Sequence, residues 1–248
     1  MTQAKKIRFL QLFNHLLTLI GIIYVCYTGY WYLFGITVIT TIVFFIFGIN
    51  ISLHRYITHQ SFETHIIIER ILLIIGCLCL VGSPFSWALS HINHHAYADK
   101  EGDPYSPHRL SLWEFLMTHF EPIKFQKLNT KRLLKNKNVM FLHEYYFIPI
   151  FCYCILLGLI NPWLIIFAWA IPSLITLYLL LINNIICHTI GYRNFKTPDE
   201  TRNNILMSIL TFGEGWHNNH HANPTLWKQG IKWWELDPTS WFIRIIKK

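Results

Sequence analysis

The 248-residue sequence carries little charge for its length. Only 14% of its residues are Asp, Glu, Lys or Arg, whereas soluble domains carry about a quarter of such residues. Hydrophobic residues make up 53% of the chain. This imbalance excludes an ordinary soluble domain and predicts an integral membrane protein. The net charge of +8 comes from Lys and Arg residues that flank apolar runs, which favours membrane lipid over nucleic acid as a partner.

Cysteine pairs of the kind found in zinc ribbons are also missing. The six cysteines lie in or beside apolar stretches, and the closely spaced ones follow a C-x-C pattern instead of C-x-x-C. We interpret all six as small buried side chains and expect no disulfide bonds. The first apolar run lacks a small-residue cleavage site behind it, so we expect a retained membrane span instead of a signal peptide.

Four long apolar runs approach the roughly 20 residues that a helix needs to cross a bilayer. They cover residues 9–29, 31–53, 145–160 and 163–187. Gly29 with Tyr30, and Asn161 with Pro162, join them in pairs, so we expect two tight helical hairpins. Lys and Arg avoid these tips and gather near both termini and from Lys100 to Lys137. The positive-inside rule therefore predicts that both termini and the central basic segment are cytoplasmic.

A fifth apolar run, residues 66–89, is not expected to cross the membrane. A single crossing would put the histidines on its two sides on opposite membrane faces, where one metal site could not use both. Glu69, Arg70, Gly82 and Pro84 also interrupt the run. We therefore predict an all-α integral membrane protein with four transmembrane helices and an interfacial or re-entrant helix at 66–89. Its single domain, residues 1–248, is completed by a cytoplasmic helical cap formed by residues 90–142 and 188–248.

Nine of the fourteen histidines fall into four tight groups. Positions i, i+3 and i+4 share a face of a helix, so each of two H-x-x-H-H motifs directs three imidazoles the same way. Positions five apart diverge by about 140° on an ideal α-helix. We therefore expect the two histidines of H-R-Y-I-T-H either to serve different metals or to be separated by a helix end. The nine are His54, His59, His91, His94, His95, His188, His217, His220 and His221.

So many imidazoles indicate a metal centre, although imidazole alone does not choose between zinc, copper, iron and nickel. Nine ligands exceed what one ion takes and suit two ions with open positions, whereas structural zinc prefers four ligands, usually including cysteine. A ferritin-like carboxylate centre would need two Glu-x-x-His motifs, and only Glu214 with His217 forms one. We interpret the other five histidines as ordinary polar residues: His15, His65, His108, His119 and His143.

These motifs resemble the membrane fatty-acid desaturase family, in particular its delta-9, stearoyl-CoA desaturase-like branch of bacterial type. H-R-Y-I-T-H and H-I-N-H-H-A-Y-A-D-K-E-G-D-P-Y-S-P look like the first two histidine boxes. N-I-I-C-H, which contains Asn184 and His188, looks like the extra pair before the third box. G-E-G-W-H-N-N-H-H-A-N-P closely resembles the third box, and W-W-E-L-D-P-T-S-W resembles the tail of bacterial members. The likeness runs from His54 to about Trp234.

The resemblance implies four spans, a cytoplasmic cap and two non-haem ferrous ions (Fe2+). All nine histidines would be the catalytic metal ligands, with Asn184 acting through a water. The implied reaction inserts a cis double bond, at carbon nine in this branch, into a saturated acyl chain with O2 and two electrons. The protein would be a multi-pass oxidoreductase of fatty acid biosynthesis in a bacterial inner membrane.

The partners follow from the same resemblance. The substrate would be a fatty acyl-CoA or an acyl-lipid. Leu89 and Ser90 replace charged residues of the animal acyl-CoA pattern, so the sequence does not decide between CoA and lipid as the acyl carrier. Without a haem motif, we expect a separate electron donor of ferredoxin or cytochrome type, docked on the basic face at Lys124–Lys137. Candidate substrate-binding walls of an acyl tunnel, or alternatively interfacial anchors, are the aromatic residues Trp87, Tyr97 and Trp216.

Two other functions fit parts of this pattern. A histidine-box hydroxylase of the alkane, carotenoid or sphingolipid type would share iron and O2 but form an alcohol. The third box and the pair of Asn184 and His188 favour the desaturase. A metal transporter would need ionisable residues inside its spans, yet residues 145–183 carry no charge and the histidines cluster at span ends.

Overall fold

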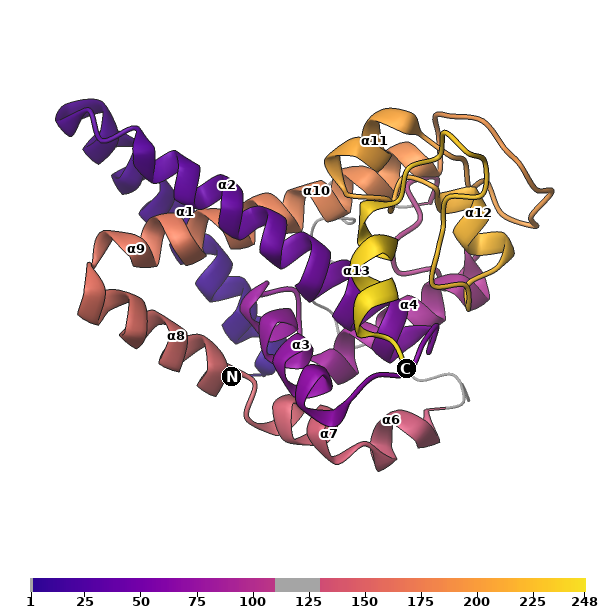
Figure 1. The fold of residues 1–248 in the computed structure, drawn as a ribbon, viewed down its shortest axis with the longest axis horizontal. Coiled ribbons are helices and arrows are strands. Elements are labelled where there is room, and N and C mark those ends of the chain that lie inside the picture. Colours follow the sequence, from indigo (N-terminus) through magenta and orange to yellow (C-terminus); the bar gives the residue numbers. More distant parts are fainter. Residues whose placement is uncertain (1, 110–129) are drawn as a thin grey trace.

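In a computed structural model of the chain, residues 2–109 and 130–248 are described, and every regular element within them is a helix (Figure 1). The all-α prediction is therefore confirmed for these residues. The basic residues Lys124 and Lys127, together with His119, lie outside the described part of the chain.

Three helical segments among the described residues are long and apolar enough to cross a membrane, and one bent pair makes a fourth candidate. The first segment is α1 (Gln3–Thr28), and the second joins α2 (Tyr32–Val43) to the π-helix η1 (Phe44–Thr58). The third joins α9 (Trp163–Ile165), the π-helix η2 (Ile166–Ala170) and α10 (Ile171–Cys187). The bent pair is α7 (Lys137–Glu144) with α8 (Phe147–Ile160).

The predicted span at 145–160 differs most from expectation in its length and straightness. Its helix α8 has 14 residues, and α7 precedes it at an angle of 70°. A helix of that length falls short of the roughly 20 residues that a straight crossing needs. By length and composition, the structure therefore has three to four candidate spans.

The two expected hairpin turns are present. Gly29 ends α1 in the left-handed region (φ 74°), and its N–H donates to the Val25 carbonyl, so the chain reverses within four residues. Asn161 and Pro162 separate α8 from α9. The ring of Trp163 stacks on Tyr24 of α1, with centroids 3.5 Å apart, so the two hairpin ends touch.

The run at 66–89 forms two helices instead of the single helix predicted. The first, α3 (Ile66–Leu78), has 13 residues and is too short to span. Leu80 and Gly82 both have positive φ (57° and 114°), so the chain turns there. Ser83 then caps α4 (Pro84–Tyr97) by accepting a hydrogen bond from Ser86 N. The second histidine box therefore lies on α4, which begins six residues before the predicted boundary of the cap.

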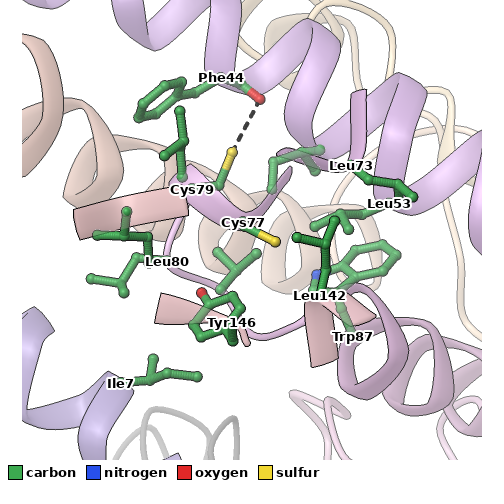
Figure 2. Packing of buried hydrophobic residues seen from close by; sticks show 14 of the residues in the cluster. Ile7, Phe44, Leu53, Leu73, Cys77, Cys79, Leu80, Trp87, Leu142 and Tyr146 are labelled. Carbon is green, nitrogen blue, oxygen red and sulfur yellow. Dashed lines mark hydrogen bonds between the residues drawn. The ribbon is translucent and has the colours of Figure 1, made fainter. Parts of the chain in front are cut away.

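A buried apolar cluster packs α3 against η1 (Figure 2). In Figure 2, Leu53 of η1 lies beside Leu73 of α3, and Cys77 of α3 and Tyr146, the residue before α8, belong to the same group. Gly48 of η1 permits this approach, because a Cβ there would clash with Cys79. All six cysteines are free thiols. This packing fixes the end of η1, which carries the first histidine box.

The remaining helices bring the other boxes to the same end. In Figure 1, α12 (His217–Ala222) and α11 (Ile205–Leu210) lie near the ends of α4 and α10, away from the α1–α2 turn. The last helix, α13 (Pro238–Ile246), packs on η1. The short helix α6 (Lys131–Lys135) precedes α7. The histidines on both sides of α3 therefore share one end of the molecule, as the crossing argument required.

Candidate metal centre

The nine predicted histidines come together as two groups of side chains. Within each group, one ring nitrogen of every histidine lies within 4.8 Å of those of the others. We call the groups the five-histidine site and the four-histidine site. The five-histidine site contains His54, His59, His91, His95 and His220. The four-histidine site contains His94, His188, His217 and His221.

The end of the second span is π-helical, and this places His54 and His59 in the same site. A π-helix bonds residue i to i+5, and His59 N donates to the His54 carbonyl at 3.1 Å. The two ring centroids are 4.9 Å apart. The expectation that they would serve different metals is wrong, because it assumed α-helical geometry. The other possibility, that a helix ends between the two histidines, is confirmed in part, because η1 ends at Thr58.

Each H-x-x-H-H motif contributes to both sites. On α4, His91 and His95 belong to the five-histidine site, whereas His94 belongs to the four-histidine site. On α12 the division is reversed, with His217 and His221 in the four-histidine site and His220 in the other. The shared helix face was predicted from the spacing, but the division between two sites was not.

Four histidines also contact a carboxylate through their outer nitrogen, Nδ1. A carboxylate there fixes the tautomer and orientation that leave Nε2 free to bind a metal. The pairs are His54–Glu214 at 2.5 Å, His94–Asp103 at 2.8 Å, His188–Asp99 at 2.9 Å and His221–Asp199 at 2.9 Å.

The inward nitrogens have no protein partner that would explain their positions. Nε2 of His59, His94, His188, His217 and His221 is buried without a hydrogen bond among the described residues. In the five-histidine site, Nε2 of His220 lies 2.9 Å from that of His54 and 3.0 Å from that of His95. Buried polar atoms are costly when unpaired, and converging imidazole lone pairs are metal ligands. The side chains present therefore fit two metal ions.

Burial favours the neutral form of several of these imidazoles. Burial lowers the pKa of His91, His95 and His217 well below the usual value, and neighbouring histidines lower it further. A neutral ring offers its lone pair to a metal. Burial alone would raise the pKa of Asp99, but contact with His188 lowers it to about 2, so this carboxylate is ionised at neutral pH.

A fully buried arginine stands behind one of the carboxylates. Nε and Nη2 of Arg55 donate to Glu214 Oε1 at 3.1 and 2.8 Å. Its Nη1 donates to Asp237 Oδ2 at 2.8 Å and to the Trp227 carbonyl at 2.9 Å. This network ties the first and third histidine boxes to the segment before α13.

A cavity borders both sites. Its apolar wall comes from η1 and α10, and Trp87 lines it while stacking on His91, with centroids 4.9 Å apart. The lining residues are Ile49, His54, Trp87, His91, Tyr105, Leu180, Leu181, Asn183, Asn184, Glu214 and His217.

The other predicted polar and aromatic site residues lie in different places. Asn184 lines the cavity and donates to the Tyr105 carbonyl at 2.7 Å. Trp216 is buried in the cap, where its Nε1 donates to the Leu236 carbonyl at 2.7 Å. Tyr97 is on the last turn of α4. Neither Trp216 nor Tyr97 lines this cavity. Their roles toward substrate stay predictions, as does the role of Trp87.

Comparison with known proteins identifies the family. The sequence model of the fatty acid desaturase family matches residues 28–244. The chain is 32% identical over 225 residues to the sn-2 palmitoyl-lipid 9-desaturase of Nostoc sp. (strain 36), covering 88% of this chain and 79% of that protein. This chain belongs to the fatty acid desaturase family. It is therefore an oxidoreductase that acts on fatty acyl chains.

Two other relatives are named for different acyl carriers. This chain is 29% identical to the acyl-CoA C20 Delta5-desaturase of Anemone leveillei, over 99% of this chain and 83% of that protein. It is also 29% identical to the sn-1 stearoyl-lipid 9-desaturase of Anabaena variabilis, over 81% of this chain and 75% of that protein.

The carboxylates of the desaturase are the residues that sequence reasoning missed. Asp99 and Asp103 were visible only as part of the second box, and Glu214 was considered only as half of a Glu-x-x-His motif. Its carboxylate contacts His54 instead. Asp199 had no sequence signal, because folding alone brings it to His221.

Proposed function

We propose that this desaturase inserts a cis double bond at carbon nine of a saturated acyl chain, using O2, two electrons and two non-haem iron ions. The observation that carries the proposal is the cavity, in which an apolar wall meets imidazoles of both histidine sites. Carbon nine is supported by the 9-desaturases of Nostoc and Anabaena. Because the Anemone relative is named as a Delta5-desaturase, product analysis has to determine the position of the double bond.

The chain's own residues would position the substrate. Ile49, Leu180 and Leu181 offer an apolar surface along which methylene groups lie, and burial excludes water from it. His54 and His91 border the cavity from the five-histidine site and His217 from the other, so one acyl chain can pass beside both. Bound iron would supply the oxidising power that an unactivated C–H bond requires. Asn184 would act on the metal through a water.

The nine histidines would hold this iron pair through their inward nitrogens. The carboxylate contacts support this role, because a ligating histidine usually presents its other nitrogen to a carboxylate or carbonyl. Imidazole ligation also fits zinc or copper, so the metal must be measured. Elemental analysis of the purified protein should give two iron ions per chain, and zinc in their place would contradict the proposal.

The proposed topology has four spans, a single domain and a cytoplasmic cap with both termini. It is supported by the gathering of all nine histidines into two groups and by the contact of Arg132 with the Thr58 carbonyl beside the first histidine box. The short helix α3 would lie at the interface. Labelling of single cysteines in intact bacterial cells tests this. A cysteine at Asn161 should react with an impermeant reagent from outside, and one at Lys248 should not.

The electron donor would dock on the basic helix α6. Arg132 of this helix donates from Nη2 to the Thr58 carbonyl at 3.1 Å, immediately before the ligand candidate His59. Lys131 and Lys135 are exposed on the same helix, so an acidic ferredoxin or cytochrome would find a complementary surface there. Charge reversal of both lysines should raise the KM for the reduced donor and leave kcat near normal.

The fatty-acid profile of an aerobic host tests the reaction itself. Gas chromatography–mass spectrometry should detect new monoenes when the chain is expressed, and their derivatives should locate the double bond at carbon nine. Hydroxylated lipids instead would establish the hydroxylase alternative. The purified enzyme, supplied with reduced donor and either acyl-CoA or phospholipid vesicles, would then identify the acyl carrier.

A further inference from the structure

The two histidine sites differ in the charge that surrounds them. Three of the four histidines in the four-histidine site contact an aspartate, namely Asp99, Asp103 or Asp199. Among the described residues, only one of the five histidines in the other site contacts a carboxylate, and that carboxylate, Glu214, is paired with Arg55. The surroundings of the two sites are therefore unequal, whatever ion they hold.

Neutral donors surround the aspartate side chains of the four-histidine site, while among the described contacts Arg109 and Arg193 donate to the backbone carbonyls of Asp99 and Asp199 and not to their carboxylates. Asp103 accepts hydrogen bonds from the backbone N–H groups of Asp99 and Tyr105. Asp199 accepts from the Thr201 backbone N–H and from hydroxyl groups. Among the residues that the structure describes, no Lys or Arg forms an ion pair with Asp99, Asp103 or Asp199. Three carboxylates therefore surround this site without an ion-paired Lys or Arg in the described part of the chain.

The five-histidine site has a smaller excess of negative charge among the described residues. The guanidinium of Arg55 is 1% exposed and lies 2.8 Å from both Glu214 and Asp237, so this network of two carboxylates and one cation carries one net negative charge. Gln229 adds a neutral donor to the Glu214 carboxylate at 3.3 Å.

Negative charge around a metal stabilises its higher oxidation state, because the ion with the larger positive charge gains more from it. Net charge and hydrogen bonding to the ligands are the means by which proteins set the potentials of iron centres. We propose that the four-histidine site has the lower reduction potential and retains ferric iron, while the five-histidine site accepts the first electron. The inference rests on the two-iron centre proposed above.

The electron balance is one electron for each ion. A one-electron donor of ferredoxin or cytochrome type is oxidised once as the ferric ion of the five-histidine site becomes ferrous, and a second donor molecule then reduces the four-histidine site. The position of α6 agrees with this order, since Arg132 contacts the backbone beside His59, a member of the five-histidine site.

A redox titration of the full-length protein, loaded with 57Fe in detergent, tests this order. Mössbauer spectra at each potential count ferric and ferrous ions without requiring turnover. We expect two one-electron steps of different potential. Asp199→Asn and Asp103→Asn should each move the lower potential upward and leave the upper one in place. If each variant weakens ferric relative to ferrous binding tenfold, the shift is about 59 mV.

Two further variants make the result specific. Glu200→Gln removes an exposed carboxylate beside Asp199 whose ion pairs in the described part of the chain are with Arg193 and Arg202, so neither potential should move. Glu214→Gln should move the upper potential only. Equal potentials, or a shift of the upper step in Asp199→Asn and Asp103→Asn, would overturn the inference. Fewer than two iron ions per chain would instead refute the two-iron centre on which it rests.

Discussion

Arg55 and Glu214 form a buried ion pair, and the Glu214 carboxylate also contacts His54. Arg55 therefore helps to position His54, its neighbour in the first histidine box, through a residue of the third box. The guanidinium and carboxylate are 2.8 Å apart, and Glu214 Oε2 lies 2.5 Å from His54 Nδ1. Although burial alone would raise the pKa of Glu214, contact with His54 and Arg55 lowers it to about 2. The pair therefore stays ionised across the physiological pH range.

Replacing Arg55 by Ala should destabilise the protein strongly. The change leaves two carboxylates buried without their cation, and breaking a buried pair in this way costs about 3–5 kcal/mol. Thermal unfolding in detergent should show a large fall in Tm together with loss of bound metal. Glu200→Ala, which removes only exposed surface pairs, should leave Tm nearly unchanged. Equal Tm values for the two variants would contradict a structural role for the pair.

The ligand assignment makes a selective prediction about histidines. His220→Ala should abolish monoene formation while the protein still inserts in the membrane, because it removes a member of the five-histidine site. His65→Ala is the matched control. His65 lies at the start of α3, outside both sites, and caps its helix by accepting from Ile67 N. Its variant should keep near-normal activity, and a fully active His220→Ala would refute the assignment.

The sequence predicted the membrane class, the nine histidines and the position of most apolar helices, because hydropathy and spacing are local properties. It could not predict that His54 and His59 join one site. A π-helix is not distinguishable from an α-helix by residue type, and tertiary packing of η1 against α3 accompanies it here. The 70° bend before α8 does have a local signal, because Pro149 in the first turn of α8 cannot donate to the Tyr145 carbonyl and so disfavours a continuous helix there.

The carboxylate contacts were beyond sequence reasoning for another reason. Asp199 and His221 are 22 residues apart, and Asp99 and His188 are 89 apart. No periodicity links such pairs, so only the folded chain shows them. The break between α3 and α4 was partly foreseen, since Gly82 and Pro84 interrupt the apolar run at the place where the chain turns.

The close approach of α3 and η1 predicts which glycine can be replaced. Gly48→Ala should destabilise the protein, because its Cβ would collide with Cys79 Sγ and crowd the Ile75 carbonyl at 3.2 Å. Overpacking of this kind costs about 1–3 kcal/mol. Gly35→Ala on α2 meets nothing within 4 Å and should be neutral or slightly stabilising. Comparison of the two Tm values checks this, and a normal Gly48→Ala would argue against the packing.

The cavity predicts a change in chain-length preference. Leu181→Trp adds bulk to the apolar wall, so longer acyl chains should lose more desaturation than shorter ones. The measurement is the ratio of monoenes of different length in the expressing host. Leu159→Trp, on a side chain that is 80% exposed on α8, should leave this ratio unchanged. A uniform loss across lengths in Leu181→Trp would indicate misfolding instead of altered fit.

The buried acid Glu69 predicts a fall in stability in mild acid. Burial alone would raise its pKa, but donors from Asn138, Tyr56 and Asn136, at 2.9, 2.7 and 3.1 Å, lower it below the usual value. A lowered folded-state pKa favours the ionised form, so the stabilisation is present above the unfolded-state pKa of about 4.3. It is lost as the pH falls through the folded-state value. Thermal melts from pH 7 to pH 3 should therefore show a steeper loss of Tm at the acid end for the parent than for Glu69→Gln, which starts lower at pH 7. Parallel curves for the two proteins would show that Glu69 does not carry this pH dependence.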